Sequence, residues 1–249
     1  MAYADNHGVR IHYELIGAGP DLVLQHGFTQ ALEDWIECGY VAALQDHFRL
    51  VLIDARGHGL SDKPHDAGAY ALPLRVGDVT AVLDAAGISR AHYWGYSMGG
   101  FIGWGIARHA AGRLNRLVIG GSHPYARDPE AIRGWLRAAI AQGGDAIVST
   151  IAGLAGTVSP AYAARLLAAD HQAWLACAPS SDSMEDMLPG MAMPCCLYSG
   201  DADPVFAAAQ RAAAAIPGAR FVALPGLLHI PAFTDSAAVL PSVLGFLRG

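Results

Sequence analysis

The serine at position 97 stands in a setting that could turn its hydroxyl into a nucleophile. The string from Gly95 to Gly99, Gly-Tyr-Ser-Met-Gly, follows an apolar run typical of a buried strand and opens a stretch of helix length. At such a strand-to-helix turn the serine is held on a strained turn, and small flanking residues let neighbouring backbone pass close by. The helix start also adds a positive dipole where an oxyanion would form. We predict that Ser97 is a catalytic nucleophile.

Short apolar runs and helix-length segments alternate on both sides of this serine. An alternating strand pattern occupies residues 9–15, and runs typical of fully buried parallel strands lie at 22–25, 50–53, 92–95, 117–119, 195–199 and 221–224. The segments of helix length are 31–46, 74–86, 98–111, 205–216 and 236–247. Strand and helix in repetition imply right-handed crossovers. The predicted fold class is therefore α/β, with a doubly wound, mostly parallel sheet.

One interval interrupts this alternation. Between the strands at 117–119 and 195–199 the sequence predicts about three helical segments and no strand, at 129–142, 146–154 and 160–178. A crossover normally needs one helix, so these segments are expected to form a helical cap inserted above the sheet. We predict a core made of residues 1–122 and 190–249, and a cap made of residues 123–189.

Two further strings resemble a known family. His26-Gly27-Phe28 follows the strand at 22–25, and residues 54–62 read Asp-Ala-Arg-Gly-His-Gly-Leu-Ser-Asp. The first resembles the oxyanion loop and the second the D-x-R-G-x-G-x-S segment of the α/β-hydrolase fold family. With the serine turn, they make the chain similar to that family over essentially its whole length. The resemblance implies a Ser-His-Asp serine hydrolase of carboxylesterase type, in which His58 and Ser61 are structural.

The resemblance also points to the base, because a serine hydroxyl needs a histidine to accept its proton. In this fold the chain order is nucleophile, acid, histidine. The histidines after Ser97 are His109, His123, His171 and His229. His229 alone follows a terminal strand, so that a loop could carry it back over the serine, and we predict that it is the base. Leu228 precedes it where the family commonly has glycine.

The acid is expected just after the strand at 195–199, where residues 200–204 read Gly-Asp-Ala-Asp-Pro. The family pattern Gly-x-x-Asp-Pro selects Asp203, and Asp201 remains the alternative. The resemblance further implies an oxyanion hole formed by the backbone N–H groups of Phe28 and Met98. His26 is expected to be a buried structural residue of that loop.

The cap is expected to decide which substrate enters, and its sequence is mostly apolar. Trp135 is a candidate for the roof of the pocket, while His123 and Tyr125 are candidates for polar contacts with the substrate. Few cationic side chains are expected to face inward, so an uncharged or weakly polar acyl group is favoured.

The leading hypothesis is a cofactor-free serine hydrolase that cleaves small carboxylic esters through an acyl-enzyme. The same machinery could instead cleave a lactone, a thioester or a carbon–carbon bond, or make peracids. Relatives that open epoxides or dehalogenate alkanes use an aspartate nucleophile, and Ser97 excludes that route. A ligand-sensing receptor with this fold is the alternative from another class, but an intact triad argues against it.

Composition excludes other classes of protein. The chain has 16 Lys+Arg against 22 Asp+Glu, without a basic cluster, so nucleic acid is not an expected partner. No H-E-x-x-H, P-loop or dinucleotide motif supports a metal or cofactor.

The absence of a C-x-x-C spacing and of a visible secretory signal predicts a cytoplasmic protein. The uncharged stretch 146–164 is long enough for a membrane span, but its Gly, Ser, Thr and Pro residues favour two buried helices. Oligomeric state is left open.

Overall fold

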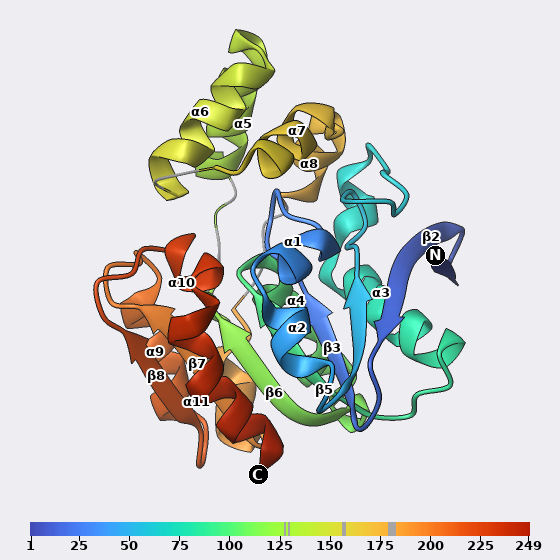
Figure 1. Ribbon diagram of the computed structural model, residues 1–249, viewed down its shortest axis with the longest axis vertical. Coiled ribbons are helices and arrows are strands. Elements are labelled where there is room, and N and C mark those ends of the chain that lie inside the picture. The colour runs from blue at the N-terminus through green and yellow to red at the C-terminus, as the bar shows by residue number, and fades with distance from the viewer. Residues whose placement is uncertain (127, 129, 156–157, 179–182) are drawn as a thin grey trace.

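A computed structural model describes residues 1–126, 128, 130–155, 158–178 and 183–249, and its centre is one sheet of eight strands. The strand order is β1-β2-β4-β3-β5-β6-β7-β8, with β1 and β2 antiparallel to each other, β2 antiparallel to β4, and the rest parallel (Figure 1). The predicted doubly wound, mostly parallel sheet is thus confirmed. The strands are β1 (Ala2–Asn6), β2 (Val9–Ile16), β3 (Asp21–Gln25), β4 (Arg49–Ile53), β5 (Ala91–Tyr96), β6 (Leu114–Gly120), β7 (Cys195–Gly200) and β8 (Arg220–Leu224).

Helices cover both faces of this sheet. Apolar side chains of α3 (Leu72–Ala85), α4 (Met98–His109) and α9 (Phe206–Ala215) pack into a cluster on one face. Those of α1 (Leu32–Glu37), α2 (Tyr40–Leu44) and α11 (Ser236–Arg248) pack into a second cluster on the other. Shorter segments complete the core: α10 (Pro231–Thr234) and the 3-10 turns η1 (Ala67–Tyr70) and η2 (Ala111–Arg113).

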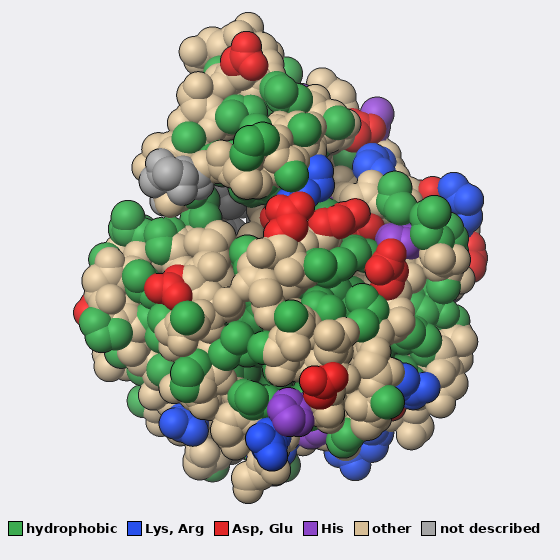
Figure 2. All heavy atoms as spheres, in the orientation of Figure 1, with side chains coloured by type: hydrophobic (Ala, Val, Ile, Leu, Met, Phe, Trp, Pro, Cys, Tyr) green, Lys and Arg blue, Asp and Glu red, His purple; other side chains and the backbone are tan. Residues whose placement is uncertain are grey.

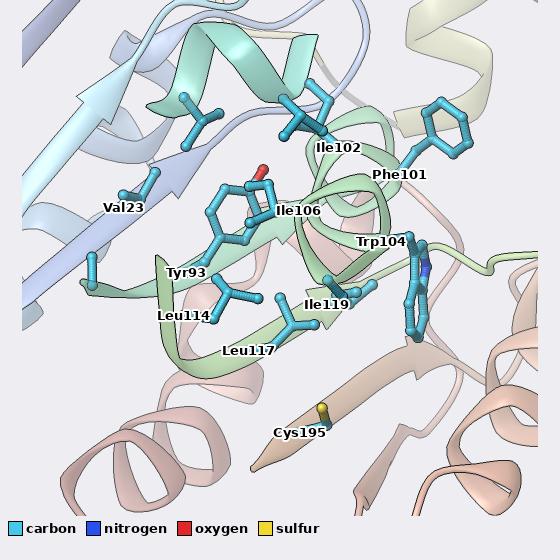
Figure 3. Packing of buried hydrophobic residues seen from close by; sticks show 14 of the residues in the cluster. Val23, Tyr93, Phe101, Ile102, Trp104, Ile106, Leu114, Leu117, Ile119 and Cys195 are labelled. Carbon is cyan, nitrogen blue, oxygen red and sulfur yellow. The ribbon is translucent and has the colours of Figure 1, made fainter. Parts of the chain in front are cut away.

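The two clusters follow from the period of two in a strand, which sends successive side chains to opposite faces. Figure 3 shows Tyr93, Leu117 and Cys195 from three neighbouring strands on the face that packs against α4. Cys196 belongs to the cluster on the other face. The two adjacent cysteines therefore point apart, as their position in a strand predicts.

Two predicted helices are each divided in the structure. The segment 31–46 forms α1 and α2, because Gly39 between them takes a left-handed conformation with φ 83° and the helical path stops there. The segment 160–178 forms α7 (Pro160–Ala168) and α8 (His171–Cys177). Asp170 begins α8, since its carboxylate accepts the N–H groups of Gln172 and Ala173.

The cap region lies above the carboxyl ends of the strands (Figure 1). It contains α5 (Glu130–Gln142), α6 (Gly144–Ala155), α7 and α8, whose buried apolar side chains form a cluster of their own. After α8 the chain returns through the 3-10 segment η3 (Glu185–Gly190), where Met184 and Leu188 pack into the cluster of α3, α4 and α9. The domain boundaries at 122 and 189 stay a prediction.

The uncharged stretch 146–164 is shared between α6 and α7, as two separate helices. Ser159 begins α7 by accepting the N–H of Tyr162, and Pro160 occupies the first turn. None of the helices in the described part of the chain is long and apolar enough to cross a membrane.

Candidate active site

The turn between β5 and α4 holds Ser97 in an unusual backbone conformation. Its φ is 50° and its ψ is −106°, and its N–H donates to Gly120 O at 2.8 Å. A non-glycine residue with positive φ is strained, and such residues concentrate at functional sites. The close approach explains Gly99 as well: a Cβ there would lie 2.1 Å from Gln25 O. The glycine thus lets α4 begin directly beside β3.

Ser97, His229 and Asp203 form a continuous chain of hydrogen bonds. Nε2 of His229 lies 2.9 Å from Ser97 Oγ, and Nδ1 lies 2.7 Å from Asp203 Oδ2. An ionised carboxylate can only accept, so Nδ1 carries a proton and Nε2 is left with a lone pair for the serine hydroxyl. This is the tautomer in which an imidazole removes a proton from serine. The three residues come from three different strand ends, after β5, β7 and β8.

Asp203 is well placed to orient this imidazole. Its side chain is 1% exposed and also accepts the N–H of Val205 at 3.0 Å. Burial raises the pKa of Asp203, but the hydrogen bond and charge of His229, with the Val205 N–H, outweigh it and leave the pKa below its usual value. Asp201, the alternative acid, instead accepts the N–H of Gly226 in a turn. The structure thus brings Asp203 to His229.

The loop after β8 positions His229 without the glycine that commonly precedes it in the family. Leu228 stands there and is exposed to solvent. The hydroxyl of Tyr96 donates to His229 O, and the two rings are 5.4 Å apart between centroids. The His229 side chain keeps 35% of its exposure, whereas that of Asp203 is buried. Water can therefore reach the imidazole but not the Asp203 carboxylate.

Two backbone N–H groups are available beside Ser97. Met98 is the first residue of α4, and the first N–H groups of a helix have no partner within it. Gly27 also lies close to Ser97, because a Cβ built on it would be 3.4 Å from Ser97 Cβ. Phe28 follows it, so that its N–H belongs to the peptide next to the serine. Both positions predicted for the oxyanion hole thus border Ser97.

His26 fixes the direction of that Phe28 N–H. Its Nδ1 donates to Gly27 O at 2.8 Å, and its Nε2 accepts the N–H of Ala55 at 3.1 Å. In a trans peptide the C=O and N–H point in opposite directions, so holding Gly27 O on His26 turns the Phe28 N–H away from it. This contact gives His26 the structural place that the sequence predicts.

The loop at 54–62 supports the loop that contains His26 and Phe28. Asp54 is fully buried, and its carboxylate accepts the N–H groups of Leu32 and Leu60 and contacts Nδ1 of His12 at 2.8 Å. Burial raises the pKa of Asp54, but these contacts outweigh it and the pKa is lowered. Ser61 Oγ donates to Asp54 O at 2.7 Å. His58 is also buried, so this segment has the structural contacts expected of it.

The predicted substrate contacts are less closely tied to the serine. Tyr125 packs with the cluster of α3, α4 and α9, and the guanidinium of Arg211 lies 3.8 Å above its ring. Trp135 packs within the cap cluster. The ring of His123 is 5.6 Å from that of Tyr125. Contacts of these three residues with a substrate stay a prediction.

The sequence did not reveal the residues through which the cap meets the site. Phe28, which follows Gly27, and Ile230, which follows His229, both pack against the cap cluster. Met98 packs with Cys177 at the end of α8. The hydroxyl of Thr29 is hydrogen-bonded to the hydroxyl of Tyr162 on α7. These are ordinary apolar and hydroxyl residues, and nothing in their types or spacing signals a contact over so many intervening residues.

In the described residues, no group of three or more His, Cys, Asp or Glu side chains is placed to hold a metal ion. What the arrangement offers chemically is a serine hydroxyl, an imidazole with a free lone pair, a buried carboxylate and two backbone donors. This set can attack a carbonyl carbon and stabilise the resulting oxyanion.

Comparison with known proteins agrees with this fold. A model of the alpha/beta hydrolase fold family matches residues 20–141. Over the full length of both chains, the structure superimposes on the enol-lactonase from Burkholderia xenovorans LB400 with a TM-score of 0.86 and 28% identity. An esterase from Rhodococcus sp. ECU1013 gives a TM-score of 0.84 and 25% identity, covering 99% of this chain and 98% of the esterase. The chain has the α/β-hydrolase fold and is similar to members of that family.

Sequence relatives match over shorter stretches. The bifunctional epoxide hydrolase 2 of Sus scrofa is 34% identical over 102 residues, which are 40% of this chain and 18% of that protein. The matched part thus spans less than a fifth of this relative's length. The family and the hydrolase class of its members are common to all these comparisons, whereas the named substrates differ.

Proposed function

We propose that this protein is a serine hydrolase that cleaves small, largely uncharged carboxylic esters through an acyl-enzyme intermediate. The hydrogen-bonded chain from Ser97 through His229 to Asp203 is the observation that carries the proposal, with distances of 2.9 Å and 2.7 Å. A binding protein would have no need of an imidazole in the tautomer that accepts a serine proton. The cytoplasmic location stays a prediction.

In the first half of the proposed reaction, Ser97 Oγ attacks the ester carbonyl and its proton passes to Nε2 of His229. Asp203 holds the ring and stabilises the imidazolium that forms. The N–H groups of Phe28 and Met98 bind the oxyanion, and loss of one such donor typically costs about 2.7–4 kcal/mol of barrier. His229 then gives its proton to the leaving alcohol, and Ser97 is left acylated.

In the second half, His229 accepts a proton from water, which attacks the acyl carbonyl, and the imidazolium then gives that proton to Ser97 Oγ as the bond to the acyl group breaks and the acid is released. The exposed side of the imidazole gives that water access. The preference for uncharged acyl groups rests on the apolar residues around the site, Phe28, Met98 and Ile230, all of which pack against apolar groups of the cap. Burying a charged acyl group among such side chains would be costly.

The direct test is Ser97→Ala with p-nitrophenyl acetate and butyrate. Removing the nucleophile should lower kcat by roughly 10⁶-fold and abolish labelling by a fluorophosphonate. Peptide mapping of the labelled wild type should place the adduct on Ser97. Undiminished hydrolysis by the variant would refute the proposal.

A cyclic ester is the second candidate, favoured by the full-length similarity to an enol-lactonase at 28% identity. The same serine and oxyanion donors would open a lactone, with the alcohol remaining attached to the acid. A series of lactones and open-chain esters of matched carbon number distinguishes the two by kcat/KM. The similarity to an epoxide hydrolase does not favour epoxide opening here, because the nucleophile position holds Ser97.

A further inference from the structure

Thr29, the residue after Phe28, has a backbone conformation that a threonine rarely adopts. Its φ is 68°, and the residue is 8% exposed. Positive φ is uncommon outside glycine and is a genuine outlier for a β-branched residue. Such a conformation persists when surrounding contacts over-determine it. Contacts around Thr29 must therefore hold it in this conformation.

One of these contacts comes from the cap. The Thr29 hydroxyl lies 2.9 Å from the hydroxyl of Tyr162 on α7, across 133 positions of sequence. Burial, above all, raises the pKa of Tyr162 to about 12, so this hydroxyl keeps its proton at neutral pH and can donate. On the core side, Thr29 lies in a turn from Gly27 to Gln30, which is closed by the N–H of Gly27 donating to Gln30 Oε1 at 2.8 Å and the N–H of Gln30 donating to Gly27 O at 3.3 Å.

The same face of α7 makes a second contact with this part of the core. Arg165, one turn after Tyr162, lies 2.9 Å from Asp34 Oδ1 and 2.5 Å from Glu37 Oε1. Asp34 itself accepts the N–H of Ala31 at 2.8 Å, at the start of α1. Figure 2 shows basic and acidic side chains meeting where the cap touches the core. Because residues three apart share a helix face, α7 docks on residues 29–37 at two points.

From these contacts we propose that Tyr162 acts through Thr29 as a positioning residue for the oxyanion hole. The backbone around Phe28 is held at one end by His26, which binds Gly27 O, and at the other by Tyr162, which binds Thr29. The cap would thus set the direction of a donor that belongs to the core. This inference rests on the proposed function, since it assigns that N–H to the oxyanion.

The test is Tyr162→Phe, which removes the hydroxyl and keeps the ring. On p-nitrophenyl butyrate we expect kcat to fall about tenfold, less than the 10²–10³-fold typical when a donor is removed outright, because the Phe28 N–H is still present. KM should change little, since the oxyanion forms only in the transition state. The affinity for a trifluoromethyl ketone, which presents an oxyanion, should fall in parallel with kcat/KM.

Three further variants separate positioning from a general loss of structure. Thr29→Val keeps the β-branched shape without the hydroxyl and should match Tyr162→Phe, and the double variant should be no worse than either alone. Thr29→Ser keeps the hydroxyl and should keep kcat. Tyr40→Phe is the matched control, because it also removes a buried tyrosine hydroxyl bond, to Phe233 O, and should leave kcat unchanged.

Amide hydrogen exchange gives a readout that does not need turnover. The Phe28 amide should exchange faster in Tyr162→Phe than in the wild type or in Tyr40→Phe. Unchanged exchange, an unchanged kcat, or a rise in KM alone would overturn the inference. If the wild type hydrolyses no ester and takes no fluorophosphonate on Ser97, the proposed function has failed instead, and the exchange data still report whether Tyr162 orders the loop.

Discussion

The sheet core and the cap are held together by different kinds of interaction. The core has two large apolar clusters, with Trp35, Trp94 and Trp104 wholly buried. The cap has one smaller cluster, and much of its attachment to the core is polar: Arg165 binds Asp34, and other contacts are His65 with Asp170, Thr29 with Tyr162, and Arg75 with Cys177 O.

This difference separates two tasks. Every residue proposed to react with substrate lies at a strand end or helix start of the core, where dense packing fixes its position. The cap meets Phe28 and Met98 by apolar packing and is otherwise attached through single hydrogen bonds and ion pairs, which contribute little each and can be exchanged for water. The core is therefore expected to determine the rate of the chemical step, and the cap to adjust it.

The largest expected effect lies in the core, at Asp203. Asp203→Asn should lower kcat by about 10⁴-fold, because an amide can donate to Nδ1 and favours the wrong imidazole tautomer. Asp201→Asn is the matched control, two residues away and bonded to Gly226 N. Ester hydrolysis measured for both variants decides between the two acids. A larger loss in Asp201→Asn would reverse the assignment.

An intermediate effect should distinguish the two regions directly. Leu117 on β6 and Leu136 on α5 are both fully buried, the first in a core cluster and the second in the cap cluster. Each Leu→Ala change should cost about 2–5 kcal/mol in the unit to which it belongs. For Leu117→Ala the loss should appear in the free energy of unfolding measured with urea.

For Leu136→Ala the loss should appear mainly as faster hydrogen exchange in α5–α8, since a weakly attached unit opens locally before the whole molecule unfolds. Equal losses of global stability in the two variants would show that cap and core unfold as one unit. The polar attachment of the cap would then not make it a separate unit of stability.

The smallest effect concerns the response of the cap to acid. Burial raises the pKa of Asp170, but His65 and the N–H groups that begin α8 outweigh it, so the pKa is lowered. An ionised carboxylate with a lowered pKa stabilises the folded cap above the unfolded value of about 3.9, and this stabilisation is lost as the pH falls below it.

The protection of the α8 amides against hydrogen exchange, relative to the intrinsic rate at each pH, should therefore fall as the pH drops below about 4, while protection in the strands changes less. Asp170→Asn keeps a residue that can begin the helix but removes the charge. It should cost less than about 1 kcal/mol at pH 6 and flatten the pH dependence. An unaltered pH profile in the variant would mean that Asp170 does not attach the cap.

Much of the core could be predicted because its signals are local. The strands at 22–25, 50–53 and 195–199 lie within one residue of β3, β4 and β7, since apolar runs between turn residues mark buried strands. The first strand, β1, was not predicted, because Ala2–Asn6 is short, ends in Asp5 and Asn6, which are depleted in strands, and lies at a sheet edge. Its place depends on pairing with β2 rather than on its own composition.

The residues of the candidate site also differ in whether the sequence could predict them. Ser97 is marked by its glycines, Asp203 by the family pattern Gly-x-x-Asp-Pro, and His229 by its place after a terminal strand. The Thr29–Tyr162 contact could not be predicted, because it joins two common hydroxyl residues whose approach depends on how α7 packs. Trp135, chosen as an aromatic residue of the cap, packs partly buried against the cap cluster, and its contact with a substrate stays a prediction.

The conformation of Ser97 has a consequence for attempts to make this protein more heat-resistant. At φ 50° the backbone of glycine is less strained than that of a residue with a Cβ. Replacing Ser97 by glycine is therefore expected to relieve strain and lower the free energy of the native state. The same replacement would remove the attacking hydroxyl. At this turn, then, the sequence that folds best and the sequence that can catalyse differ, and thermostabilising substitutions must be sought at other turns.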